Sequence, residues 1–187
     1  MADRLSFSAS VDIRAEAEEV FRLVSDLRRK AVLNPGIRVI RVELEGGEPV
    51  REGSVFYHRF QRGQRVMEYR TRCVRCVPPR LFESRSETDP VFEVCVTVTP
   101  VPGGCRLAQE ETVEARPELL DALENSERGA PTFLDVLRLL PLFPASRPLA
   151  AEFRVHQRER AARRLGVELR AWLEAIRDHL ERRGPVP

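Results

Sequence analysis

Two arginines and two glutamates near the middle of the chain are the residues whose types and spacing best suit acid–base or anion-binding chemistry. Arg70 and Arg72 alternate along one predicted strand, and Glu83 and Glu111 lie on two later strands. An arginine can polarise a carbonyl or hold a carboxylate, and a glutamate whose pKa is raised by burial can carry a proton. Arg70, Arg72 and Glu111 are therefore the candidate catalytic residues. In the alternative interpretation, these side chains form exposed cross-strand ion pairs, each of which contributes little stability.

Two tracings of the inner sheet face are open, because side chains alternate along each strand and the turns set the phase. The first tracing starts from Val94, Val96 and Val98 and adds charged and polar residues: Leu107, Gln109, Glu111, Val113, Glu83, Arg85, Arg70, Arg72, Tyr57 and Arg59. The second gives the earlier strands a more apolar lining: Phe56, His58, Phe60, Met67, Tyr69 and Phe82. A single β-bulge at Pro78-Pro79 switches these strands between the two sets.

The four cysteines include one CxxC pair, which resembles a redox or zinc half-site. Cys73 and Cys76 form this pair, but they lie within a strand-like run, where residues three apart point to opposite faces. A zinc site needs a second pair of ligands, and Cys95 and Cys105 do not supply one. We therefore predict reduced structural thiols.

No other motif indicates a metal, nucleotide or catalytic-serine site. The histidines are scattered, the serines lack a GxSxG elbow, and the glycine pairs lie in hairpin turns rather than in a phosphate loop. We expect no metal and no cofactor. Lys30 is the one lysine among 31 lysine and arginine residues, which we attribute to a compositional bias of the genome. The net charge of +2 gives no electrostatic reason to expect nucleic acid.

The chain begins with a strand, two short helices and a second strand. Residues Ser6 to Arg14 alternate apolar and polar side chains, as a half-buried strand does. A helix is predicted from Ala15 to Val24, and a second one from an Asp26 cap to about Leu33. Six strands separated by short turns then follow: Ile37–Glu45, Ser54–Gln61, Gln64–Val77, Arg80–Glu87, Val91–Thr99 and Cys105–Ala115. With the first strand they predict an antiparallel sheet of seven strands.

The last long stretch, Glu152 to Arg183, predicts an amphipathic helix. Its apolar residues recur at helical spacing: Leu165, Leu169, Trp172, Leu173, Ile176 and Leu180. A helix of this length reaches roughly 45 Å and needs a broad partner surface to bury that stripe. The sheet supplies such a surface, so we expect a helix gripped by a sheet with a pocket between them.

These residues carry a resemblance to a known family. The resemblance is carried by the opening SASVDIRAEAEEVFRLVSDL, by NPG, VPPRLFE and VPGGCRLAQEETVE, and by the final helix. Over residues 5–115 and 152–183, the chain resembles the START-like helix-grip superfamily (SRPBCC, or polyketide-cyclase/dehydrase-like). Cys105 stands where that family commonly has threonine, and the tryptophan that often follows the aspartate is missing. The resemblance implies an α+β helix-grip fold whose deep cavity takes an apolar or amphipathic small molecule. Polyketide aromatase/cyclases of the superfamily use a polar pocket to orient a reactive chain.

Residues 116–150 depart from the family pattern, in which the last strand leads promptly into the helix. Their apolar content, concentrated in residues 131–144, is too high for a solvent loop. We interpret the segment as a helical insertion or lid over one end of the cavity. The alternative is an exposed surface for a second copy of the chain, another partner or a membrane.

We thus expect a single START-like domain over residues 1–187 that binds a small hydrophobic or amphipathic molecule, including lipids. The expected ligand-binding residues are Tyr57, Arg70, Arg72, Glu83, Val96, Gln109, Glu111 and Trp172. A cyclase, aromatase or dehydratase acting on a polyketide-like substrate is the second interpretation, and an interaction module using residues 131–144 is the third. The N-terminus lacks an apolar signal-peptide core and no run is long enough to span a membrane, which predicts a bacterial cytoplasmic protein.

Overall fold

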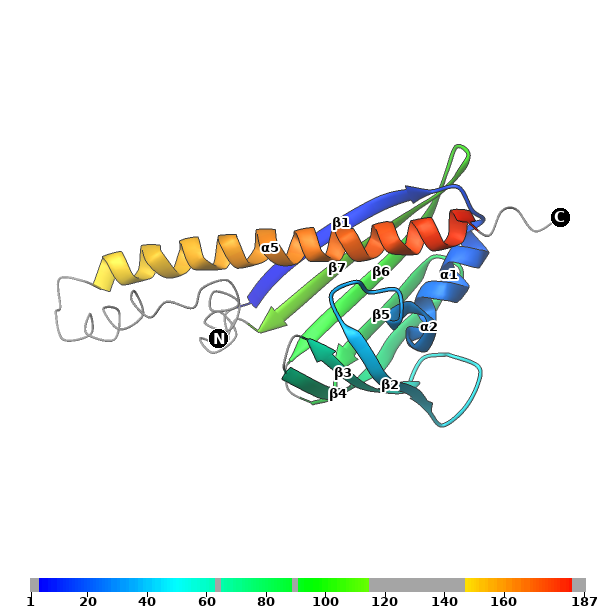
Figure 1. Cartoon of the computed structure of the whole chain (residues 1–187), viewed down its shortest axis with the longest axis horizontal. Coiled ribbons are helices and arrows are strands. Elements are labelled where there is room, and N and C mark those ends of the chain that lie inside the picture. The colour runs from blue at the N-terminus through cyan, green and yellow to red at the C-terminus, as the bar shows by residue number, and fades with distance from the viewer. Residues whose placement is uncertain (1–3, 63–64, 89–90, 115–146, 183–187) are drawn as a thin grey trace.

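A computed structural model describes residues 4–62, 65–88, 91–114 and 147–182 (Figure 1). The chain begins with strand β1 (Arg4–Ile13), helices α1 (Ala17–Ser25) and α2 (Leu27–Ala31), and strand β2 (Arg38–Glu45). Five further strands follow: β3 (Val55–Arg62), β4 (Arg65–Val77), β5 (Leu81–Ser86), β6 (Phe92–Val101) and β7 (Gly104–Glu114). The last element is helix α5 (Arg147–Arg182).

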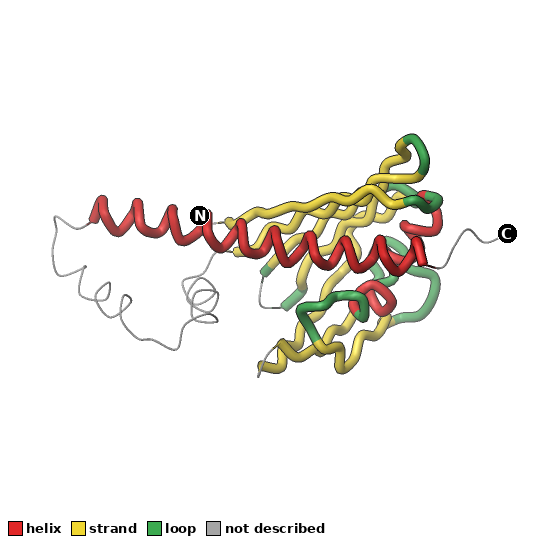
Figure 2. The backbone as a smooth tube through the Cα atoms, turned by 45° about the horizontal axis from the view of Figure 1, so that its top comes forward, coloured by secondary structure: helices red, strands yellow, loops and turns green. Residues whose placement is uncertain are grey.

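The seven strands form one antiparallel sheet in the order β1-β7-β6-β5-β4-β3-β2. Each strand from β2 to β6 pairs with the strand that follows it in the chain, and β1 pairs with β7, with Leu5 opposite Val113 and Ile13 opposite Cys105. The predicted α+β helix-grip architecture with a seven-stranded antiparallel sheet is confirmed. Figure 2 shows this sheet, in yellow, as a twisted layer with α5 lying across one of its faces.

Helix α5 runs along β1, and its N-terminal part extends beyond the start of that strand (Figure 1). Arg158 donates to the carbonyl oxygen of Arg4 at 2.6 Å, and the backbone N–H of Arg14 donates to Glu181 at 3.0 Å, so the helix and the strand run in the same direction. The helix begins at Arg147 rather than at the predicted Glu152. Residues 147–150, which were assigned to the insertion, therefore belong to the first turn of α5. Residues 116–146 of that insertion, including the apolar segment 131–144, lie outside the described residues.

The core lies between the sheet and the helices. The buried face of α5 presents Leu169, Leu173, Ile176 and Leu180, which follow the predicted stripe. They pack with the inner face of α1 and with the middle of the sheet, where the fully buried side chains include Phe56, Phe82, Val96, Val98 and Leu107. In the described part of the chain, no helix is long and apolar enough to cross a membrane.

The sheet combines the two tracings of the inner face. The first tracing is right for β6 and β7, and the second is right for β3, β4 and β5. The phase changes between β5 and β6, because Phe82 is opposite Val96 in the register. A bulge does occur, but it lies within β4 between Cys73 and Arg75 rather than at Pro78-Pro79.

The prediction that the two cysteines of the CxxC pair point to opposite faces is wrong, because the β4 bulge lies between them. Cys73 is opposite Ser84 and Cys76 is opposite Phe82, and these partners are two residues apart on one strand. Both cysteines therefore lie on the inner face, not on opposite faces, because the extra residue of the bulge restores their phase. Burial raises the pKa of Cys73 to about 12, which keeps this thiol protonated. None of the four cysteines forms a disulfide.

Candidate functional site

A cavity of about 270 Å³ lies between the sheet, α2 and α5. Most of its wall is apolar and comes from the inner sheet face and α2, including Phe60, Met67, Phe82, Val94, Val96 and Leu27. It adjoins a second hollow of about 330 Å³, and the two share lining residues such as Phe7, Ile37 and Trp172. The second hollow is also lined by Pro35 and Gly36, which are exposed, so we place the mouth of the cavity beside this turn.

An ion pair borders this mouth. Arg62, at the end of β3, donates to Glu168 of α5 at 2.5 Å. Both side chains line the second hollow, and Arg62 also lines the first. Because each is partly exposed, the pair contributes little stability, but it ties the end of β3 to α5 where a ligand would enter.

Lys30 is a charged side chain that lines the cavity. It is 2% exposed and lies in α2, between the apolar wall and α5. Its Nζ donates to Oε1 of Gln109 at 2.5 Å, and Nε2 of Gln109 donates to Oε1 of Glu111 at 2.5 Å. The three side chains form a hydrogen-bonded chain from α2 to β7, which we call the polar chain. In the described part of the protein, every buried side-chain nitrogen and oxygen has a hydrogen-bond partner.

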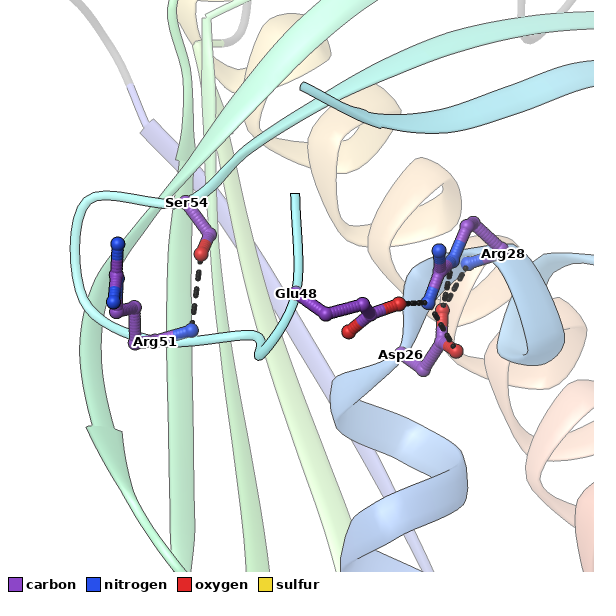
Figure 3. Close-up of polar contacts among 5 residues, drawn as sticks. All are labelled: Asp26, Arg28, Glu48, Arg51 and Ser54. Carbon is purple, nitrogen blue, oxygen red and sulfur yellow. Dashed lines mark hydrogen bonds and ion pairs between the residues drawn. The ribbon is translucent and has the colours of Figure 1, made fainter. Parts of the chain in front are cut away.

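Helix α2 is held in place at both ends, and this fixes the position of Lys30. At its N-terminus, the side chain of Asp26 accepts from the backbone N–H of Arg28 at 3.1 Å. The Arg28 guanidinium also donates to Asp26 and to Glu48 in the β2–β3 connection (Figure 3). In that connection, the backbone N–H of Arg51 donates to Oγ of Ser54 at 3.0 Å.

Trp172 of α5 holds the other end of α2. Its Nε1 donates to the carbonyl oxygen of Lys30 at 3.2 Å, and Nζ of Lys30 lies 4.8 Å from the centre of the indole ring. This cation–π contact favours the ammonium form of Lys30. A single aromatic side chain thus positions both the backbone and the amine of Lys30.

Burial pushes Lys30 and Glu111 toward their neutral forms. Loss of hydration lowers the pKa of Lys30 to about 8, although attraction to Glu111 opposes the shift. Burial likewise raises the pKa of Glu111, against the opposing effects of Lys30 and Gln109. Burial thus brings the pKa values of the two groups closer together, which favours proton transfer between them and suits acid–base chemistry.

A second polar group lines the cavity on β3 and β4. Nε2 of His58 and Oγ1 of Thr71 lie 2.9 Å apart, and the His58 ring stacks on Tyr69 with 4.8 Å between ring centres. Burial lowers the pKa of His58 to about 4, so this imidazole is neutral at pH 7. Burial also raises the pKa of Tyr69, which keeps its hydroxyl protonated. These groups offer a ligand neutral hydrogen-bonding partners.

The structure brings together Val96, Gln109, Glu111 and Trp172 of the expected ligand-binding residues, all of which line the cavity. The other four, Tyr57, Arg70, Arg72 and Glu83, lie on the opposite face of the sheet, and their expected inward orientation is therefore wrong. The cause is the change of phase between β5 and β6.

The two arginines form exposed ion pairs instead. Arg70 pairs with Glu45 at 3.0 Å, and Arg72 pairs with Glu87 at 2.6 Å. Neither of these two arginines lies beside Glu111, and the cation whose charge lowers the pKa of Glu111 is Lys30. The binding roles of the expected residues remain predictions.

Sequence reasoning missed Lys30, although one signal was present. A single lysine in a chain that otherwise uses arginine is unusual, and a compositional bias explains the arginines but not the exception. The neighbouring positions Arg28 and Arg29 show that α2 otherwise follows the bias. Hydrophobic periodicity could not place a lysine inside the core, since lysine is almost never fully buried.

Most of the chain matches a known protein family. The model of a family described as "Polyketide cyclase / dehydrase and lipid transport" matches residues 4–132. No curated protein matches the chain. Among solved structures, 234 chains match, and the three described next are all under 25% identical, so they show the fold alone.

The di-domain ARO/CYC StfQ from the steffimycin biosynthetic pathway superposes with a TM-score of 0.66 at 16% identity, covering 98% of this chain and 52% of that one. The di-domain ARO/CYC BexL from the BE-7585A pathway gives 0.61 at 22% identity, covering 95% and 50%. TTHA0849 from Thermus thermophilus gives 0.59 at 12% identity, covering 96% and 99%. The chain spans about half the length of the two di-domain proteins.

Proposed function

Because the chain belongs to the polyketide cyclase/dehydrase and lipid transport family, we propose that it binds a small hydrophobic or amphipathic molecule in the cavity between the sheet and α5. The observation that carries this proposal is the combination of mostly apolar cavity walls with a few polar groups, among them the polar chain of Lys30, Gln109 and Glu111. Small-molecule sites commonly combine apolar walls with a few polar groups that fix orientation.

The polar groups matter for affinity. Burying roughly 200 Å² of apolar ligand surface contributes about 5 kcal/mol at about 25 cal/mol per Å². Association itself costs at least about 4 kcal/mol, so apolar contacts alone leave weak binding. A ligand oxygen that accepts a hydrogen bond from Lys30 or Gln109 supplies the remainder. We therefore expect an oxygenated ligand, with a carbonyl, carboxylate or phenol at its polar end. The cavity volume favours a molecule of modest size.

Native mass spectrometry of the protein purified from its own host tests this proposal, followed by denaturing extraction of the bound molecule. We expect a stoichiometric small molecule on the wild type. Val94→Phe fills the cavity and should be purified empty, whereas Val74→Phe makes the same change at an exposed position outside the cavity and should retain the ligand. Wild-type protein that is empty, or a Val94→Phe variant that keeps its ligand, would contradict cavity binding.

A second candidate function is ring closure, aromatisation or dehydration of a polyketide-like substrate. The observation that favours it is that Lys30 and Glu111, joined through Gln109, both line the cavity and can move a proton to or from a substrate carbon or oxygen. The test is incubation with a linear poly-β-keto thioester, with cyclic products followed by mass spectrometry. We expect Glu111→Gln and Lys30→Met to abolish product formation above the spontaneous background. Equal rates in wild type and variants would contradict an enzymatic role.

The third interpretation, a partner or membrane contact through residues 131–144, concerns residues outside the described part of the chain.

A further inference from the structure

Lys30 is an exception in both composition and position. It is the one lysine among 31 lysine and arginine residues, yet it is almost fully buried and lines the cavity. An arginine supplies a permanent positive charge, whereas a lysine can also lose its proton and become a nucleophile. A buried side chain that only balanced the charge of Glu111 could be either arginine or lysine. A side chain that presents a neutral amine to a ligand must be lysine, because arginine keeps its proton.

Burial of Lys30 favours the neutral amine, although two neighbouring groups, Trp172 and Glu111, favour its charged form. The groups that face its Nζ are the Trp172 indole from α5 and the Gln109 side chain from β7, with Glu111 beyond Gln109. His58 from β3 and Tyr69 from β4 line the same cavity, and burial favours the uncharged form of both. At about pH 7.5, an amine with a pKa of about 8 is neutral in roughly a quarter of the molecules, against about one in a thousand at the usual 10.5.

We propose that Lys30 forms a reversible imine with an aldehyde or ketone carbonyl of the molecule bound in the cavity. This inference rests on the proposed function, because the cavity must first bind the carbonyl compound. The expected ligand is therefore an amphipathic molecule that carries an aldehyde or ketone carbonyl, rather than any oxygenated molecule. The simplest such molecules that also have an acidic C–H bond are 1,3-dicarbonyl compounds.

The reaction balances without an oxidant or a reductant. The lone pair of Nζ attacks the carbonyl carbon, a C–N bond forms, and the carbonyl π electrons move to the oxygen, which takes up a proton as the nitrogen loses one. The resulting carbinolamine accepts a second proton on its hydroxyl group, and water leaves as the nitrogen lone pair forms the C=N bond. The protonated imine withdraws electrons from the adjacent carbon, so its C–H bond becomes more acidic. Hydrolysis reverses every step.

The polar chain supplies the protons that these steps require. Glu111, whose pKa burial raises, can protonate the leaving hydroxyl group and recover the proton later. Gln109 contacts both Lys30 and Glu111 at 2.5 Å, and it can transfer its hydrogen bond from the amine to the carbinolamine oxygen. Glu111 is thus the proton carrier, and Gln109 is a positioning residue, for one nucleophile.

The test uses the full chain with acetylacetone and benzoylacetone, two small 1,3-diketones that convert a neutral lysine into a stable enaminone. Intact mass spectrometry detects the adduct, and peptide fragmentation assigns it to Lys30 or to the N-terminal amine. Quenching of Trp172, the single tryptophan, reports non-covalent entry of each probe. Reduction with cyanoborohydride in the presence of benzaldehyde provides an independent trap.

Two variants provide matched controls. Arg29→Lys/Lys30→Arg moves the one lysine to the adjacent exposed position, and we expect it to lose the adduct. Arg29→Lys alone keeps Lys30 and adds an exposed lysine, so its adduct should remain at residue 30 only. This second variant retains the native core, and the test therefore does not depend on the folding of the first.

The outcomes separate this inference from the proposed function. An adduct confined to Lys30 supports the imine. Quenching of Trp172 without an adduct, or an adduct that favours the introduced lysine in the Arg29→Lys variant, overturns the imine and leaves cavity binding in place. If the probes neither quench Trp172 nor react, both the imine and the binding of small carbonyl compounds in this cavity are overturned.

Discussion

Replacing Lys30 by methionine should change how the free energy of unfolding depends on pH. In the folded protein the pKa of Lys30 is lowered to about 8, whereas in the unfolded chain it returns to about 10.5. Between these values the unfolded chain binds one more proton than the folded protein. Stability therefore rises with pH across this window and is lowest below pH 8, where the buried amine must be charged.

The magnitude follows from the same two pKa values. One pKa unit corresponds to about 1.4 kcal/mol, so the shift from 10.5 to about 8 corresponds to about 3 kcal/mol. The wild type should gain this amount, relative to Lys30→Met, as the pH rises from about 8 to about 10.5. Lost contacts with Gln109 and Trp172 add a constant offset, so the pH dependence of the difference is the diagnostic quantity.

Urea denaturation followed by Trp172 fluorescence, at several pH values from about 7.5 to about 10.5, measures the effect. The tyrosines titrate in both proteins and cancel in the difference. Glu111 is coupled to Lys30 and does not cancel, so the pair of proteins is also compared in a Glu111→Gln background. A difference that stays constant within about 0.5 kcal/mol over this range would refute the reasoning that burial dominates the ionisation of Lys30.

Three further predictions follow from particular contacts. Because Lys30 is the one lysine, ¹³C-lysine labelling gives a single NMR titration, whose midpoint we expect near pH 8. In Glu111→Gln the midpoint should move to lower pH, since the attraction that raises the pKa of Lys30 is lost. An unchanged midpoint would contradict the coupling between Lys30 and Glu111. A Cβ on Gly104 would lie 2.0 Å from the carbonyl oxygen of Ile13, so Gly104→Ala should destabilise the fold by at least about 2 kcal/mol in urea denaturation. Gly103→Ala, at a φ of +80° in open space, should cost only about 1 kcal/mol, and equal costs would refute the close approach. Arg70→Gln and Arg72→Gln should each leave ligand binding unchanged and alter the free energy of unfolding by less than about 1 kcal/mol, because their ion pairs are exposed on the outer face of the sheet. Loss of the ligand in native mass spectrometry would show that the outer face takes part in binding.

Much of the fold could be predicted because its signals are local. The stripe from Leu165 to Leu180 repeats at helical spacing, and the alternation from Ser6 to Arg14 marks a half-buried strand, so neither requires knowledge of a distant partner. Short connections between strands then restrict the sheet to an antiparallel meander. The helix boundary differed from the prediction: α5 begins at Arg147, five residues before the predicted start, since a helix end depends on capping and packing as well as on periodicity.

The candidate site was only half predictable. Gln109, Glu111 and Val96 follow correctly from the alternation of β6 and β7, because a tight turn joins these strands. The prediction that Arg70 and Arg72 point inward carries the same alternation through the β5–β6 connection. A shift of one residue there moves every side chain of the earlier strands to the other face of the sheet. The bulge in β4 likewise reversed the expectation for the CxxC pair.

The element types, their order and the apolar stripes follow from local sequence patterns, since these depend on residues within a few positions of one another. The phase between β5 and β6, the shared face of Cys73 and Cys76, and the burial of Lys30 beside Gln109 and Trp172 follow only from the packed fold. Strand phase, hydration and charge interactions depend on neighbours in space, which local patterns do not specify. Lys30 meets residues that lie 79 and 142 positions away along the chain, and only the packing of α2 between β7 and α5 turns an isolated lysine into a buried amine that lines a cavity.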